Sequence, residues 1–174
     1  MSDQNTASTD TASTDKSSTP PAATTATATT GYGSEALDRM VERLQGTNDP
    51  RRRYEYVLWL AKKLSPMAAE LECDQIKVKG CVSEVYVLGE LVEGKLHWQG
   101  NSDALITKGL LALLIQGLSE LTPEQVLAVD PGFIEATGLQ GSLTPSRANG
   151  FLNILRAMQS QALQLSLGIS PTAS

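Results

Sequence analysis

Hydrophobic residues recur every three or four positions between residues 34 and 64, which predicts two amphipathic helices. Ser34 is placed to cap the first helix, and Gly46 stops it. Asp49 caps the second helix, whose first position is Pro50. The predicted buried stripes are Leu37, Met40, Val41 and Leu44, followed by Tyr54, Val57, Leu58, Ala61 and Leu64.

The pattern becomes β-rich after a connection over Ser65–Gln75. Val82–Leu91 consists largely of β-branched, aromatic and aliphatic residues, which favour a strand. Lys95–Gln99 is a second such run, and the turn Val92–Gly94 separates the two. Together they predict a β-hairpin.

A nearly all-apolar helix is predicted over Asp103–Gly117, with Asn101 or Ser102 as its cap and Asp103 in its first turn. A helix that is hydrophobic all round lies buried at the centre of a domain. Lys108 interrupts the run, which also falls short of the roughly 20 residues that a membrane span needs. We therefore expect a central core helix and no membrane segment.

Three further helices are predicted in the last third of the chain. A capping-box pattern starts a short helix at Thr122, and another short helix covers Pro131–Ala136. The last and longest helix starts at Thr144, and its apolar face contains Ala148, Phe151, Leu152, Leu155, Met158 and Ala162. The predicted fold class is α+β, in which a small antiparallel β-sheet packs against a bundle of α-helices.

The first 33 residues contain no Leu, Ile, Val or Phe, so they cannot bury enough surface to offset chain entropy. We expect a disordered tail over residues 1–33, a folded domain over residues 34–168 and a frayed C-terminus over residues 169–174. The tail has neither the apolar run of a secretory signal nor the arginines of a transit peptide. We therefore expect a cytoplasmic protein.

Composition excludes several classes of function. Lys and Arg total 14 against 19 Asp and Glu, so no basic footprint for nucleic acid is expected. The two cysteines are too few for a disulfide framework, and with a single histidine they match no paired zinc signature. We find no nucleophile elbow, phosphate-binding loop or EF-hand, and we expect no cofactor or metal bound by the chain itself.

Cys81 is the residue most suited to chemistry, because it follows Gly80 and opens the β-rich run. This placement predicts a thiol at a loop tip that a strand holds in position. The alternative is a small buried side chain, which is how most free cysteines behave. His97 is the only histidine that could act as its base, although the alternation along the strand equally allows an exposed side chain.

Three ordered blocks carry a resemblance to a known family. They are Gly80-Cys-Val-Ser-Glu-Val-Tyr86, Gln99-Gly-Asn-Ser-Asp-Ala-Leu-Ile-Thr-Lys-Gly109 and Leu143-Thr-Pro-Ser-Arg-Ala-Asn-Gly150. In their order and spacing they resemble the SufE family, and the similarity covers roughly Ala36 to Leu165. Tyr86 and Asn101 depart from the tryptophan and aspartate that the family often has at these positions.

The resemblance implies a sulfur carrier rather than a free-standing enzyme. SufE-like proteins take sulfane sulfur from a SufS-type cysteine desulfurase that carries pyridoxal phosphate (PLP). They stimulate that enzyme and pass the sulfur to iron–sulfur scaffold proteins. The resemblance assigns the acceptor role to Cys81. It does not decide whether the chain forms a homodimer. The rival interpretation is a regulatory adaptor domain whose cysteine is structural.

The matched blocks also suggest supporting residues. Arg147 is the favoured cation to stabilise a Cys81 thiolate, because a nearby positive charge raises the thiolate fraction. Two roles are open for Asp103. It stabilises the N-terminus of its helix, or it biases how the Cys81 loop docks. The remaining loop and docking candidates are Gly80, Ser83 and Lys108, with Lys77 and Lys79 as further cations. Cys73 lies among acids and is expected to be a poor nucleophile.

Overall fold

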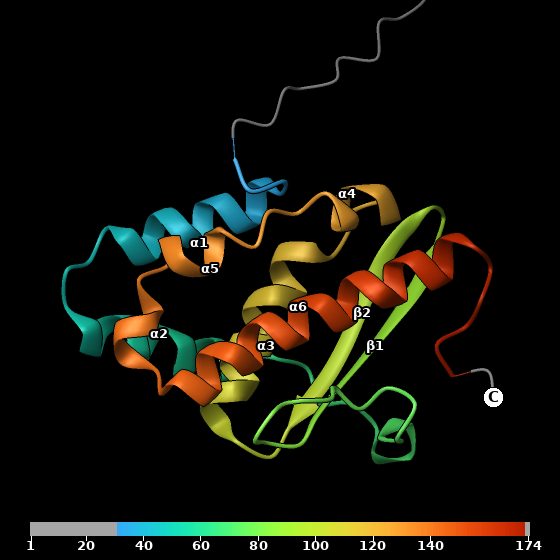
Figure 1. Cartoon of the computed structure of the whole chain (residues 1–174), viewed down its shortest axis with the longest axis horizontal. Coiled ribbons are helices and arrows are strands. Elements are labelled where there is room, and N and C mark those ends of the chain that lie inside the picture. The colour runs from blue at the N-terminus through green and yellow to red at the C-terminus, as the bar shows by residue number, and fades with distance from the viewer. Residues whose placement is uncertain (1–30, 173–174) are drawn as a thin grey trace, which may run out of the picture.

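The computed structural model describes residues 31–172 and has the predicted α+β architecture (Figure 1). Its elements in chain order are α1 (Glu35–Gln45), α2 (Pro50–Lys63), the 3₁₀ turn η1 (Ala69–Leu71), β1 (Val85–Val92), β2 (Lys95–Ser102), α3 (Leu105–Leu118), α4 (Pro123–Leu127), α5 (Phe133–Ala136), the 3₁₀ turn η2 (Leu139–Ser142) and α6 (Pro145–Ser166). Most of the tail predicted for residues 1–33 lies outside the described residues, as do residues 173–174.

The first two helices begin where their caps were predicted. The Ser34 hydroxyl accepts a hydrogen bond from the Leu37 amide, and the Asp49 carboxylate accepts one from the Arg51 amide. The whole predicted stripe of α1 is buried. In α2 the buried positions are Val57, Leu60 and Ala61, so Leu60 joins the core in addition to the predicted residues. The predicted Tyr54, Leu58 and Leu64 are only partly buried against it.

The hairpin forms with shifted ends. β1 starts at Val85 instead of Val82, because Val82 is 81% exposed in a loop that precedes the strand. β2 continues to Ser102, which pairs with Val85. The segment 76–78 runs alongside β1, since Val78 donates to the Val85 carbonyl at 2.8 Å and Val87 donates to the Ile76 carbonyl at 3.1 Å. This third, short partner anchors one side of the loop that holds Cys81.

Helix α3 is the buried centre of the molecule, as its composition predicts. Figure 1 shows it behind α6, and it contacts α1, α2, β2 and α6. A Cβ added to Gly109 would clash with the Val57 carbonyl oxygen, so glycine permits the close approach of α2 and α3. The predicted start of α3 is wrong: the N-cap is Ala104, and no side chain caps the helix, because β2 extends into the expected capping residues.

The last helices enclose the remaining side of the core. Thr122 and Gln125 form the predicted capping box of α4. Helix α6 crosses the face of the hairpin and buries Phe151, Ile154 and Met158 (Figure 1). Among residues 31–172, no helix combines the length and the apolar character that crossing a membrane would require.

Candidate functional site

Cys81 lies in the loop between the segment 76–78 and β1, packed against α6. Gly80 turns the chain there with φ +79°, a conformation that L side chains rarely adopt. The Cys81 thiol is half-buried, and its Sγ lies 3.6 Å from the Gly150 carbonyl oxygen of α6. Gly150 belongs to the third matched block, so two sequence-distant glycines frame the thiol.

Asn153 bonds this loop to α6. Its Nδ2 donates to the Gly80 carbonyl oxygen at 3.0 Å, one residue before the thiol. A Cβ on Gly80 would lie only 2.8 Å from the same Nδ2, so the glycine and the asparagine fit each other. No role was predicted for Asn153 from the sequence. The sequence did contain one signal for it. Residues 150 and 153 are three positions apart, so they share one face of a helix, and Gly150 belongs to a matched block.

Asp103 ties the other end of the loop to the sheet. Its Oδ1 accepts from the Glu84 amide at 3.0 Å, and its own amide donates to the Glu84 carbonyl at 3.3 Å. It therefore lies outside the first turn of α3 and bonds the loop that carries Cys81. Glu84 also pairs with Lys77 at 2.7 Å. The loop is thus held from the strand side as well as from α6.

The other candidates from the matched blocks differ in whether they contact this loop. The Ser83 hydroxyl lies 3.3 Å from the Thr107 hydroxyl of α3. Lys108 is the next residue of α3 and is half-buried, but it makes no side-chain hydrogen bond or ion pair within the described residues. Gly80, Ser83 and Asp103 therefore meet at the Cys81 loop, whereas Lys108 lies beside it.

Burial raises the pKa of the Cys81 thiol above its ordinary value of 9.0. Loss of hydration is the only cause that acts on it, so no cation among the described residues lowers that pKa in this conformation. Arg147 is exposed in the first turn of α6, one turn before Gly150. In this conformation the thiol is therefore mostly protonated at neutral pH, which slows its reactions because the thiolate is the nucleophile.

His97 and Cys73 take no part in this arrangement. His97 pairs with Glu90 in the hairpin, five residues along β1 from Val85. At about 3.3 Å per residue, this separates it by roughly 16 Å from the end of the sheet near Cys81. Its Nδ1 lies 3.1 Å from a Glu120 carboxylate oxygen instead. Cys73 is a half-buried free thiol that precedes the segment 76–78.

Together, the fold and this loop define a small α+β protein whose chemistry would pass through one cysteine. Within residues 31–172 no group of three or more side chains could hold a metal ion. The family model for SufE, described as an Fe-S metabolism associated domain, matches residues 38–162. The chain belongs to the SufE family.

Similar proteins agree with this assignment. A SufE-like protein of Synechocystis is 55% identical over 77% of this chain and 84% of that protein. The cysteine desulfuration protein SufE of Plasmodium vivax is 47% identical over 64% of this chain, and SufE-like protein 1, chloroplastic/mitochondrial, of Arabidopsis thaliana is 39% identical over 74%. The chain spans 46% and 35% of the length of these two eukaryotic proteins.

A solved structure has the same fold. It is the solution structure of a hypothetical protein from Thermus thermophilus, with a TM-score of 0.67 and 26% sequence identity. The match covers 77% of this chain and 98% of that one.

The family assignment supports a role in iron–sulfur metabolism together with a cysteine desulfurase.

Proposed function

We propose that the chain accepts sulfane sulfur on Cys81 from a SufS-type cysteine desulfurase and stimulates that enzyme. The observation that carries the proposal is the Cys81 thiol, held at a loop tip by Gly80, Asn153 and Asp103 and covered by α6. Family membership supplies the partner.

The transfer is a thiol–disulfide exchange. The Cys81 thiolate attacks the outer sulfur of the enzyme's persulfide, a new S–S bond forms on Cys81, and the enzyme's cysteine leaves as a thiolate. No net oxidation occurs, and the proton of Cys81 is released before the attack. Because the thiol packs against the Gly150 carbonyl and its burial raises its pKa, we infer that the loop opens before the attack. Once it is open, Arg147 is the cation we assign to stabilise the thiolate.

The stored sulfur then passes to iron–sulfur scaffold proteins. The PLP of the reaction belongs to the desulfurase, and this chain needs no cofactor of its own. A cytoplasmic location is part of the same proposal, although one plant relative carries a chloroplastic and mitochondrial name. The rival function is an adaptor domain with a structural cysteine.

A measurement of desulfurase turnover distinguishes sulfur acceptance from the adaptor function. With L-cysteine and a SufS-type desulfurase, the wild-type chain should raise the rate of alanine formation, and Cys81→Ser should abolish the increase. Serine cannot form a persulfide, and the half-buried site loses no large apolar group. Cys73→Ser is the matched control and should keep full stimulation. Full stimulation by Cys81→Ser, or its loss in Cys73→Ser, would refute the assignment.

A further inference from the structure

Helices α1 and α2 carry a row of side chains that the proposed function does not use. The rings of Tyr56 and Trp59, one turn apart on α2, stack with their centroids 5.7 Å apart and an angle of 18° between their planes. The Arg43 guanidinium of α1 lies 5.2 Å from the centre of the Tyr56 ring, and the Lys63 ammonium lies 5.5 Å from that of Trp59. We call these four residues the aromatic row.

Trp59 is the exposed ring of the aromatic row. It is 47% exposed, although tryptophan is highly buried on average. The buried residues of α2 are Val57, Leu60 and Ala61, and the helix packs against α3, so Trp59 lies outside the packed face. A ring that is already stacked loses little conformational entropy when a partner binds. Tryptophan, tyrosine and arginine are also the residues that most often dominate the binding energy of protein interfaces.

A small hollow adjoins the aromatic row at Lys63. Its volume is about 230 Å³, which is below the roughly 300 Å³ at which small-molecule sites begin. Lys63 is the only charged residue that lines it, and the others are apolar or uncharged polar residues, among them Leu64, Trp98 and Gln116. The hollow therefore suits one side chain of a partner, whose neighbouring carboxylate can pair with Lys63.

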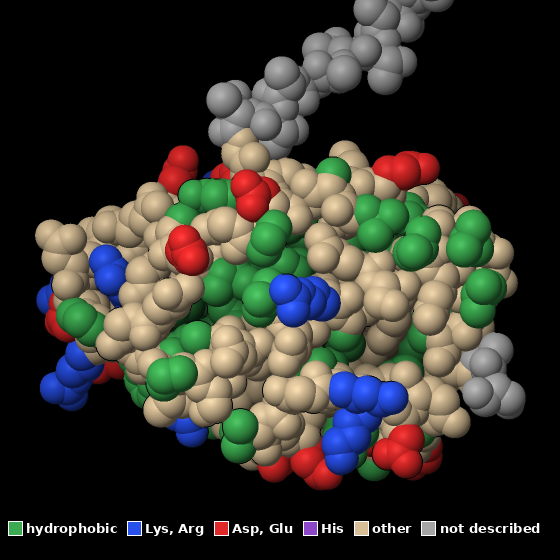
Figure 2. Space-filling view, in the orientation of Figure 1, with side chains coloured by type: hydrophobic (Ala, Val, Ile, Leu, Met, Phe, Trp, Pro, Cys, Tyr) green, Lys and Arg blue, Asp and Glu red, His purple; other side chains and the backbone are tan. Residues whose placement is uncertain are grey.

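The charges around the aromatic row favour an acidic partner. Residues 35–63 contain seven of the 14 Lys and Arg of the chain but only five acids, whereas the whole chain has a net charge of −5. Figure 2 shows Lys and Arg side chains at the end of the molecule where Figure 1 places α2. Four of the five acids are bound, since Glu35, Asp49 and Glu55 pair with arginines and Asp38 accepts from the Tyr32 amide. Glu42 is the one acid of the two helices without such a bond among residues 31–172, against three cations without an ion pair, Arg43, Lys62 and Lys63.

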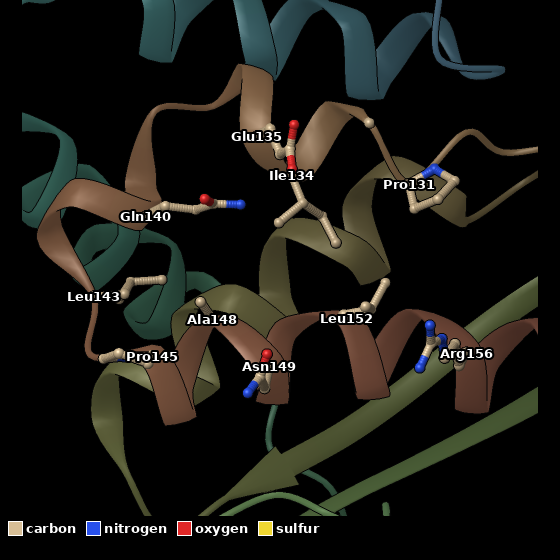
Figure 3. Close-up of a pocket in the computed structure, with 11 residues that line it drawn as sticks. Pro131, Ile134, Glu135, Gln140, Leu143, Pro145, Ala148, Asn149, Leu152 and Arg156 are labelled. Atoms are coloured by element: carbon tan, nitrogen blue, oxygen red, sulfur yellow. The ribbon is translucent and has the colours of Figure 1, made fainter.

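A larger groove elsewhere lacks this selectivity. It has a volume of about 670 Å³ and lies between α6 and the segment that contains α5 and η2 (Figure 3). Ile134 and Leu152 belong to its apolar lining, but its charged residues are Glu135 and Arg156, one of each sign. Its charges therefore favour no particular partner, whereas the hollow at Lys63 has one cation and no acid.

We propose that the aromatic row and the adjoining hollow dock a segment of a partner protein in which an aromatic side chain is followed by carboxylates. The aromatic side chain enters the hollow beside Trp98, and the carboxylates pair with Lys63. Arg43 adds to the positive potential that draws the segment to the surface.

This docking site is separate from the thiol. Trp98 pairs with Gly89, which is four residues along β1 from Val85. At roughly 3.3 Å per residue, this places the hollow about 13 Å from the end of the sheet near Cys81. A partner bound at the aromatic row therefore leaves the Cys81 loop free, and the proposal does not depend on sulfur acceptance.

An NMR titration of the isotope-labelled full chain tests the site. The probe is the blocked hexapeptide Gly-Gly-Phe-Asp-Asp-Gly, which should shift the indole N–H signals of Trp59 and Trp98 but not the amides of residues 80–84. Trp59→Ala should weaken binding at least about tenfold, and Lys63→Gln about threefold. Lys62→Gln is the matched control, because it removes a neighbouring exposed charge that does not line the hollow, and it should bind like the wild type.

Further probes define what would overturn the docking site. A peptide with Asn in place of both Asp residues should bind several-fold more weakly, because it loses the pairing with Lys63. No shift at Trp59 or Trp98 with millimolar peptide, or an equal loss of binding in Lys62→Gln, would overturn the proposal. Tighter binding of a single-stranded thymidine oligonucleotide would also overturn it, because the row would then be a platform for stacked bases.

A last measurement keeps this proposal apart from the proposed function. Stimulation of the desulfurase by the wild-type chain should be the same with and without saturating peptide. A loss of stimulation with peptide would show that the aromatic row overlaps the donor's site and would refute the separate docking site. A chain that binds the peptide at the aromatic row but takes no sulfur would refute the proposed function alone.

Discussion

At the scale of single residues, the resting state of the thiol is set by its neighbours on α6. Gly150 brings a backbone carbonyl within 3.6 Å of Sγ, and Asn153 holds the carbonyl of Gly80. The resulting burial raises the pKa of Cys81. A closed, protonated cysteine protects a carrier from oxidation, because thiolates react fastest.

Asn153→Ala should therefore open the loop. One hydrogen bond contributes about 1 kcal/mol net, which corresponds to roughly a fivefold rise in the open population. In a Cys73→Ser background, the rate of Cys81 alkylation by iodoacetamide should rise by about that factor. Asn149→Ala is the matched control, because that exposed side chain of α6 makes no hydrogen bond to the loop. An alkylation rate equal to wild type would show that Asn153 does not restrain the loop.

At the scale of elements, the site forms where the loop before β1 meets α6 on one side and the residues that precede α3 on the other. The hydrophobic pattern predicted both helices at the site, α6 from its single apolar face and α3 from its nearly continuous apolar run. It missed the true end of β2 and the start of α3, since Gly100, Asn101 and Ser102 look like a turn but pair with β1. It also missed the pairing of the segment 76–78 with β1 through a single β-bridge, which only the tertiary structure reveals.

Helices α2 and α3 approach each other closely at Gly109. Gly109→Ala would drive a methyl group into the Val57 carbonyl oxygen, which forces the two helices apart. Overpacking of this kind costs about 1–3 kcal/mol, which outweighs the gain of up to about 1 kcal/mol from alanine's helix propensity. Thermal unfolding should show a lower Tm than wild type. Gly141→Ala places its new methyl group in open space and should leave the Tm equal to or slightly above that of the wild type. A Tm for Gly109→Ala at or above wild type would contradict this packing.

At the scale of the whole molecule, the fold class was predictable from the sequence, whereas the contacts around Cys81 were not. Cys81, Gly80 and Asp103 stand in blocks that mark the family, so the resemblance pointed to them directly. The link from Gly80 to Asn153 spans 73 residues, and nothing in local sequence pairs them.

The most direct test is the mass of the chain after incubation with L-cysteine and a PLP-loaded SufS-type desulfurase. Intact-protein mass spectrometry should show a gain of one sulfur atom, peptide mapping should place it on Cys81, and a thiol reductant should remove it. The Cys81→Ser chain should gain nothing. No mass gain in the wild-type chain, or a gain mapped to Cys73, would contradict sulfur acceptance on Cys81.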